Sequence, residues 1–260
     1  MSDIRLFPRL KDYINRDRAV TLAVVVRGPE ELVGVKALIP AEGESLGSLL
    51  EVPWRDELLR DAHQLMQERS DPVSRRYENG NVEVFFDIYR PLARLIIVGA
   101  VHIADSLIRY ALTLGFRTYL VDPRTAFATR ERFPLVNEMH HQWPDEALPE
   151  IGLTSETAVV VITHDPKLDD PALKVALPSP AFYVGALGSP KTHAQRVKRL
   201  LAEGLSQEQL DQLHAPIGLN IGGRSPAEIS LSIMAEIIAT RNGKPLDARV
   251  PQVLPNAVGG

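Results

Sequence analysis

Short aliphatic runs alternate with amphipathic stretches through the second part of the chain. The aliphatic runs lie at residues 95–98, 117–121, 158–162 and 182–184. Runs of this length, bounded by turn residues, are typical of strands that are buried on both faces of a parallel sheet. Stretches with helical periodicity follow them, at 102–114, 190–203 and 226–242. Strands that alternate with helices predict a Rossmann-like, doubly wound parallel sheet.

Three helix starts combine an N-cap side chain with a proline at the first helical position. They are Asp170-Pro171, Ser189-Pro190 and Ser225-Pro226. The last one also has Glu228 at the third position, which completes a capping box. Beyond it, Ile229, Ile233 and Ile237 share one helical face, and we expect this helix to end at Gly243.

Residues 1–92 have a different pattern, with predicted strands at 19–26, 36–39 and 82–88 and a predicted helix at 54–68. The sequence therefore predicts an α/β protein with a small N-terminal α+β domain (1–92) and a Rossmann-like domain (93–245). Residues 246–260 contain Pro251, Pro255 and two terminal glycines, so we expect a loose tail.

Composition excludes several classes of protein. The chain has 260 residues, of which 45% are hydrophobic and 24% charged, as in an ordinary soluble globular protein. It has no apolar run long enough to span a membrane, and its charged N-terminus lacks the apolar core of a signal peptide. The net charge of -4 gives no basic footprint for nucleic acid. With no cysteine, the chain has no disulfide and no thiolate chemistry, and we predict a cytoplasmic location.

The first candidate motif follows the run at 95–98. It is related to the dinucleotide fingerprint G-x-G-x-x-G/A, with Gly99 first and Ala104 last. Val101 stands where the second glycine would let the backbone approach a pyrophosphate. Asp122, 23 residues after Gly99, takes the position of the ribose-binding acid, and Arg124 is near enough in sequence to meet a phosphate. A Rossmann-like scaffold that binds no dinucleotide is the alternative.

Two further polar segments follow predicted strands. Thr163, His164 and Asp165 come after the run at 158–162, and Gly185 to His193 come after the run at 182–184. Because the carboxyl ends of parallel strands meet at one edge, these residues should converge there, and free N–H groups of a helix start bind anions. The alternative is local: Asp165 and Ser189 cap turns or helices without a ligand.

A fourth segment, Gly218 to Arg224, precedes the last predicted helix. Arg224 could pair with a phosphate or carboxylate, or the glycines could simply shape the loop. The sequence indicates no catalytic group. His140 and His141 have no metal-ligand spacing, and we expect no metal site.

Together these motifs resemble the xanthine dehydrogenase accessory factor family, XdhC/CoxI. The matching segments are G-A-V-H-I-A (99–104), D-P-R (122–124), F-A-T-R-E-R-F-P (127–134), T-H-D-P-K (163–167), G-A-L-G-S-P-K-T-H (185–193) and P-I-G-L-N-I-G-G-R-S-P-A-E-I (216–229). They occur in the order of the family and cover about 95–240. V-E-V-F at 82–85 also resembles the strand that precedes the family's Rossmann domain.

The resemblance implies a role in the maturation of molybdenum hydroxylases. Family members are thought to bind molybdenum cofactor, to support its sulfuration with a cysteine desulfurase, and to deliver it to a xanthine or carbon monoxide dehydrogenase. A pterin phosphate would find glycine-rich loops, helix N-termini and an arginine here. The predicted cofactor-binding residues are Gly99, His102, Asp122, Arg124, Thr163, His164, Asp165, Gly185, Gly188, Ser189, His193 and Arg224.

The chain also departs from the family pattern. Val101 replaces a glycine, and residues 27–31 and 47–51 stand where the family has G-S-x-P-R and G-S-V-S-G-G-C-V-E. These departures indicate a divergent member that has kept the second half of the site. We therefore expect an accessory protein that binds molybdenum cofactor or a nucleotide and forms a homodimer. An NAD(P)-dependent oxidoreductase using Asp122 and His164, or a non-catalytic partner of a cofactor-competent paralogue, are the alternatives.

Overall fold

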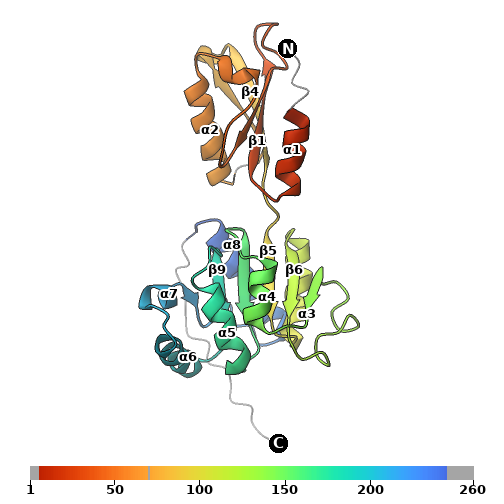
Figure 1. Ribbon diagram of the computed structural model, residues 1–260, viewed down its shortest axis with the longest axis vertical. Coiled ribbons are helices and arrows are strands. Elements are labelled where there is room, and N and C mark those ends of the chain that lie inside the picture. Colours follow the sequence, from red (N-terminus) through yellow and green to blue (C-terminus); the bar gives the residue numbers. More distant parts are fainter. Residues whose placement is uncertain (1–5, 70, 245–260) are drawn as a thin grey trace, which may run out of the picture. The chain divides into compact units, whose positions relative to one another are not determined.

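The computed structural model describes residues 6–69 and 71–244 (Figure 1). The chain divides into two compact units, Met1–Pro91 and Leu92–Gly260. Each unit has its own sheet and its own buried core. The predicted loose tail, residues 246–260, lies outside the described residues.

The N-terminal unit is built on a four-stranded antiparallel sheet in the order β2-β1-β4-β3. Its elements are α1 (Leu6–Asn15), β1 (Val20–Arg27), β2 (Lys36–Pro40), α2 (Arg55–Gln67), β3 (Val73–Tyr77) and β4 (Val82–Tyr89), with short 3-10 helices at Ser48–Glu51 and Glu78–Gly80. Ala23 and Val25 of β1 pack in the same apolar cluster as α2, whereas Val20 packs with α1. The alternation of buried positions along β1 therefore gives both faces of the sheet a helix.

Two elements of this unit are absent from the sequence-based prediction. Helix α1 buries only Leu6 and Leu10, and the edge strand β3 buries only Tyr77. Elements with so few buried positions carry a weak periodic signal.

The C-terminal unit is a six-stranded parallel sheet in the order β10-β9-β8-β5-β6-β7, which confirms the predicted Rossmann-like fold. The strands are β5 (Arg94–Val98), β6 (Arg117–Val121), β7 (Glu138–His140), β8 (Thr157–Val161), β9 (Tyr183–Ala186) and β10 (Leu213–His214). The helices are α3 (His102–Thr113), α4 (Pro144–Ile151), α5 (Pro166–Ala176), α6 (Pro190–Ala202), α7 (Gln207–Asp211) and α8 (Pro226–Arg241). None of the described helices is long and apolar enough to cross a bilayer.

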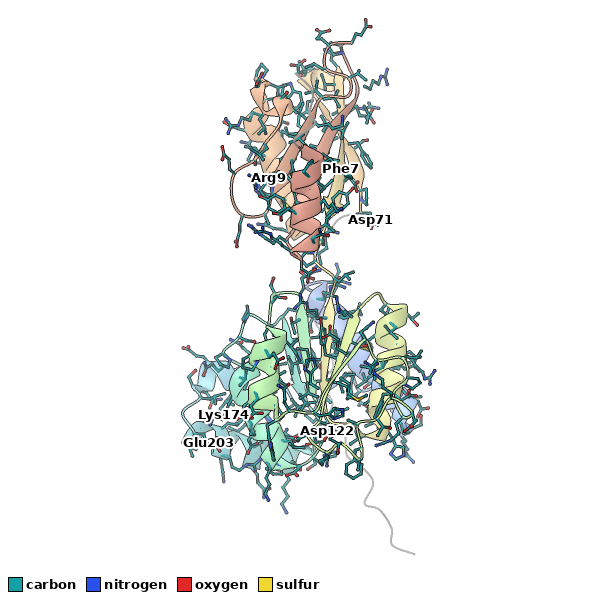
Figure 2. All side chains as sticks on the ribbon, turned by 45° about the vertical axis from the view of Figure 1, so that its right-hand side comes forward. Phe7, Arg9, Asp71, Asp122, Lys174 and Glu203 are labelled. Atoms are coloured by element: carbon teal, nitrogen blue, oxygen red, sulfur yellow. The ribbon has the colours of Figure 1, made fainter. Side chains whose placement is uncertain are left out.

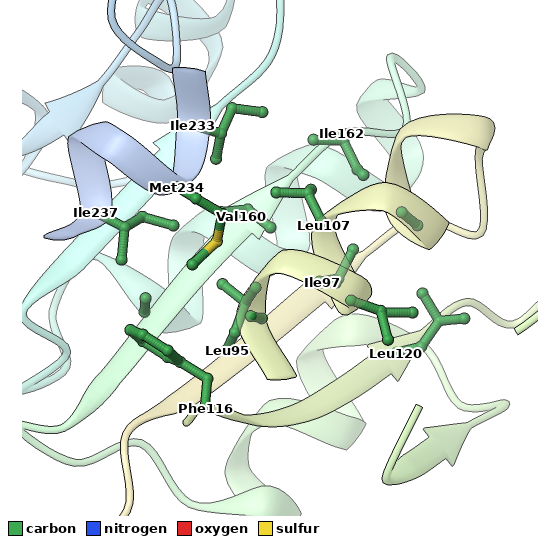
Figure 3. Close-up of a cluster of buried hydrophobic side chains, with 14 of the residues drawn as sticks. Leu95, Ile97, Leu107, Phe116, Leu120, Val160, Ile162, Ile233, Met234 and Ile237 are labelled. Atoms are coloured by element: carbon green, nitrogen blue, oxygen red, sulfur yellow. The ribbon is translucent and has the colours of Figure 1, made fainter. Parts of the chain in front are cut away.

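Helices cover both faces of this sheet, because successive strand side chains point to opposite sides. Leu95 and Ile97 of β5 pack with α3 and α8 in one core (Figure 3). Ile96 and Val98 of the same strand pack with α4, α5 and α6 in the other. This two-sided burial explains why the strands of this sheet have continuous aliphatic runs instead of an alternating pattern.

Helix starts follow the predicted caps in two of three cases. Ser189 caps α6 and Ser225 caps α8, the latter with the full capping box of Glu228. The predicted start at Asp170-Pro171 is wrong. Helix α5 begins at Pro166, because Asp165 accepts a hydrogen bond from the Lys167 N–H and forms an equivalent cap five residues earlier.

The core between α8 and the sheet gives a stability prediction. Ile233 is fully buried, whereas Leu231 on the same helix is 49% exposed. Ile233→Ala should lower the free energy of unfolding by about 2–5 kcal/mol through lost burial and a residual cavity. Leu231→Ala should change it by less than about 0.5 kcal/mol. Urea unfolding of the full chain measures both, and equal losses would contradict the packing of α8 described above.

Candidate functional site

The strand order reverses between β5 and β8, so the loops that follow these strands leave the sheet in opposite directions. This is the point where doubly wound sheets bind their ligands. Gly99 follows β5 with a φ of 120°, and a Cβ placed on it would lie 2.7 Å from Thr163 Cγ2. The loops after β5 and β8 therefore touch at a position that only glycine fits.

Asp122, at the end of β6, is buried and already satisfied by the chain. Its carboxylate accepts the Ala100 N–H at 2.8 Å, and the Arg124 guanidinium donates to it through Nε at 2.9 Å and Nη2 at 2.8 Å. Figure 2 shows Asp122 at the lower edge of the sheet. Burial opposes the charge of Asp122, but the bonds from Arg124 and from backbone N–H groups outweigh it and lower the pKa of the carboxyl.

The β5–α3 loop is poorly suited to a dinucleotide. Val101 is the N-cap residue of α3 and packs against the core beneath it, so its side chain occupies the place of the second fingerprint glycine. The neighbouring Ala100 N–H is bonded to Asp122, whose own oxygens are held by Arg124. Neither the loop nor the ribose-binding acid is open to the ligand in the usual way, which disfavours the NAD(P) alternative.

The segment after β8 is held by a side-chain network. The Thr163 hydroxyl donates to Asp169 Oδ1 at 2.5 Å and accepts the Asp165 N–H at 2.9 Å. His164 lies exposed between them with a φ of 64°. Asp165 caps α5. The pKa of Arg124 is raised chiefly by its hydrogen bond to Asp122, and the charge of Asp165 adds to this in the same direction.

The predicted residues after β9 divide into two groups. Gly188, Ser189 and His193 lie in the loop and first turns of α6, at the same edge as Thr163. Gly185 lies inside β9, where a Cβ would come within 2.7 Å of Ile217 and of the Tyr183 hydroxyl. Packing therefore explains the glycine at 185.

Arg196 is a residue that sequence reasoning missed. It is 1% exposed, and its Nη2 donates to Asp169 Oδ2 at 3.0 Å and to the Leu187 carbonyl at 2.9 Å. Nearby, the His193 Nδ1 has no partner among the described residues, and burial together with the charge of Arg196 lowers the pKa of His193. The available signal was the position of Arg196 four residues before the buried Leu200, on the inner face of α6.

Arg224 lies in the loop just before α8, whose start lies beside the start of α3. The Ser230 hydroxyl donates to the Ile103 carbonyl at 3.0 Å, so the first turns of α8 and α3 lie side by side. His102, the first residue of α3, and Arg224 are both exposed. Glu228 accepts the N–H groups of Arg224 and Ser225, both at 2.9 Å, and these bonds lower its pKa to about 2.

A second buried acid shapes the loop before α8. Glu236 accepts the Tyr183 hydroxyl at 2.6 Å and the Gly218 N–H at 2.7 Å, and it lies 3.2 Å from His214 Nδ1. These contacts tie the start of the Gly218–Arg224 loop to β9 and β10. Within residues 6–69 and 71–244, no group of three histidines or acids is arranged to hold a metal ion.

The buried Asp122 predicts a pH-dependent stability. Its folded pKa lies below the unfolded value of about 3.9, so the stabilisation is present above about pH 4 and is lost as the pH falls through the folded pKa. At pH 7, Asp122→Asn should cost about 1–3 kcal/mol, near the lower end because Arg124 is partly exposed.

Urea unfolding between pH 7 and pH 3 checks this prediction, and the difference between the two proteins should shrink at low pH. Asp105→Asn is the matched control, because Asp105 pairs with Arg109 on the outer surface of α3, and it should cost less than about 0.5 kcal/mol. A pH-independent cost for Asp122→Asn would contradict the ion pair.

Comparisons with known proteins bear on the site described above. A probable xanthine dehydrogenase subunit of Bacillus subtilis (strain 168) is 27% identical over 237 residues, which cover 91% of this chain and 65% of that protein. The uncharacterized protein YqeB of Escherichia coli (strain K12) is 25% identical over 240 residues, with 87% and 44% covered. The molybdenum cofactor insertion chaperone PaoD of the same organism is 28% identical over 163 residues, with 63% and 45% covered. The chain thus spans 44–65% of the length of these curated relatives.

A crystal structure of a xanthine dehydrogenase from Bacillus halodurans aligns with a TM-score of 0.53 and 21% identity, over 96% of this chain and 98% of that one. This likeness concerns the fold alone. A family model described as the XdhC Rossmann domain matches residues 95–237, which is more than half of the chain. The resemblance carried by the sequence motifs is therefore confirmed, and the protein belongs to the XdhC family.

Proposed function

We propose that this protein is an accessory factor in the maturation of a molybdenum hydroxylase of the xanthine or carbon monoxide dehydrogenase type. It holds molybdenum cofactor, or a nucleotide-extended form of it, at the carboxyl edge of the Rossmann sheet. The names of the relatives in Bacillus subtilis and Escherichia coli support this role. Membership of the XdhC family supports it as well.

One observation carries the proposal: the acids at this edge are engaged by the chain itself, whereas several donors are not. Asp122 is held by Arg124, and Asp169 by Thr163 and Arg196. Glu228 is held by the start of α8. By contrast, the Arg224 guanidinium is exposed and the His193 Nδ1 has no partner among the described residues. An edge with satisfied acids and available donors favours an anionic ligand.

The residues present fit the organic part of the cofactor. A pterin that carries a phosphate offers acceptors to the donors of the β9–α6 loop and to Arg224, and the remaining predicted residues line the neighbouring loops. When bound in the client enzyme, the cofactor supplies the redox centre for hydroxylation. This chain has no cysteine and therefore no thiolate to ligate molybdenum or to carry a persulfide. In this proposal the chain holds the cofactor without covalent chemistry.

Because this chain would hold the cofactor without covalent chemistry, other proteins must supply the sulfur and receive the cofactor. A cysteine desulfurase carries the sulfur, a molybdenum hydroxylase receives the cofactor, and a homodimer in the cytoplasm is the working form that we propose.

The absence of cysteine also favours one second candidate. In the N-terminal unit, the residues that replace the family's glycine–cysteine segment form the 3-10 helix Ser48–Glu51, with Leu49 buried. A protein without this loop could serve as a non-catalytic partner of a cofactor-competent paralogue. The two candidates differ in whether the purified chain retains a pterin.

Arg224 provides the test. Pterin fluorescence and molybdenum content are measured after gel filtration of protein from cells that make the cofactor. Arg224→Ala should weaken retention about ten- to a hundredfold, because it removes a charge-assisted contact, and the exposed position of Arg224 should leave the melting temperature unchanged.

Arg9→Ala is the matched control, since Arg9 is likewise an exposed arginine and lies on α1 (Figure 2). It should retain the cofactor fully. Absence of pterin from the unmodified protein would favour the candidate of a non-catalytic partner, and full retention by Arg224→Ala would remove Arg224 from the site.

A further inference from the structure

Arg196 is a buried cation whose hydrogen-bonding capacity is only partly used. Its side chain is 1% exposed, and both bonds to Asp169 and the Leu187 carbonyl are made by Nη2. Nε and Nη1 have no acceptor among the residues that the structure describes. Buried polar groups in folded proteins nearly always have partners, and charged ones all the more so. Two buried, unpaired donors on one guanidinium therefore point to an acceptor from outside the chain.

The need to join α5 to α6 does not explain why Arg196 is buried, because Arg199 already links the two helices. Arg199 lies one turn further along α6 and makes two bonds to Asp170, from Nε at 2.5 Å and from Nη2 at 3.0 Å. A second bridge between the same helices joins Lys174 to Glu203 at 2.9 Å. These helices are thus already joined by ion pairs whose basic side chains are partly exposed, whereas Arg196 is buried and bonds to the Leu187 carbonyl of the β9–α6 loop.

The unpaired Nη1 lies close to Gly188. A Cβ placed on Gly188 would be 3.7 Å from Arg196 Nη1 and 3.3 Å from Thr192, and Gly188 has a φ of 152°. Glycine at position 188 therefore keeps side-chain atoms away from this nitrogen. Glycine at 188 is therefore explained by close approach and by backbone conformation together.

Two further groups that can favour an anion lie near Gly188 and Arg196: the N-terminus of α6 and the His193 ring. Helix α6 is 13 residues long and begins at Pro190, so its positive dipole end lies in this loop. The His193 Nδ1 is buried and has no partner among the described residues, and the charge of Arg196 acts on this ring. The acid that pairs with Arg196, Asp169, is bonded to Thr163 and to Nη2, and burial raises its pKa and so opposes its negative charge.

We propose that the β9–α6 loop, residues 187–193, with Arg196 beneath it, is the subsite for a phosphate or pyrophosphate group. The inference rests on the proposed function in assigning that group to the bound cofactor. The proposed subsite differs from the usual phosphate site of a Rossmann fold, which is the loop after the first strand of the sheet. In this chain Val101 stands at the second glycine position of the β5–α3 loop, and Asp122 holds the Ala100 N–H. The subsite proposed here lies two strands away, after β9.

The test is calorimetric titration of the full chain with inorganic phosphate and with pyrophosphate. The unmodified protein should bind pyrophosphate saturably. Arg196→Lys keeps the charge but loses the planar fork, and should weaken binding at least about tenfold. Arg199→Lys is the matched control, because it changes the same residue type on the same helix, and its affinity should stay within about twofold.

Gly188→Ala provides a second variant, since the added Cβ narrows the approach to Arg196 Nη1 and should weaken binding in the same direction. A readout that needs no variant comes from the His193 ring. A bound anion favours the protonated imidazole, so pyrophosphate should raise the pKa of His193 in an NMR titration. The NMR titration uses the unmodified protein, so it tests the subsite even if Arg196→Lys does not fold.

Three results would overturn the subsite: no saturable binding, equal losses in Arg196→Lys and Arg199→Lys, or a His193 pKa that pyrophosphate leaves unchanged. Failure of the proposed function looks different. Pyrophosphate binding that depends on Arg196, in a protein that retains no pterin, would keep the subsite and reject the cofactor.

Discussion

The close approach of Gly99 to Thr163 is the constraint on which the rest of the site depends. It joins the loops of the two central strands where the sheet order reverses, and it leaves no room for a side chain at position 99. From Thr163 the contacts continue through Asp169 to Arg196 and so to the Leu187 carbonyl after β9. In the other direction, Ala100 binds Asp122, which holds Arg124 after β6. One row of polar contacts thus fixes four loops along the carboxyl edge.

That row also determines what the edge can do chemically. A general base needs an acceptor that faces the ligand, and Asp122 and Asp169 both face arginines of the chain. His164 is exposed at the end of β8, without the buried setting against an acid that orients a catalytic histidine. The groups at this edge that could still face a ligand are hydrogen-bond donors at helix N-termini and in glycine-containing loops. Such an arrangement can stabilise an anion, in keeping with the proposed holding of a cofactor.

Much of the fold was predictable from sequence, because two-sided burial leaves an unmistakable aliphatic run in strands such as β5 and β8 and because Ser225 and Glu228 form a local cap. Elements that bury one or two residues, such as β3 and β10, were not predicted. The site was harder for a different reason. The glycine at 185 is explained by Ile217, and Arg196 is paired with Asp169. Contacts between residues so far apart in sequence are set by tertiary packing rather than by any local pattern.

The row of polar contacts lies entirely within the C-terminal unit, between Gly99 and Arg196. It therefore involves neither residues 27–31 nor residues 47–51, the two segments where the sequence departs from the motifs of the family it resembles. Ligand holding and thiol chemistry are physically separable in such a protein, since the first needs donors fixed by the sheet and the second needs a cysteine. This chain has no cysteine, but Gly99, Thr163, Asp169 and Arg196 make their contacts without one. Under the proposed function, these contacts would support ligand binding, and sulfur transfer would fall to a partner.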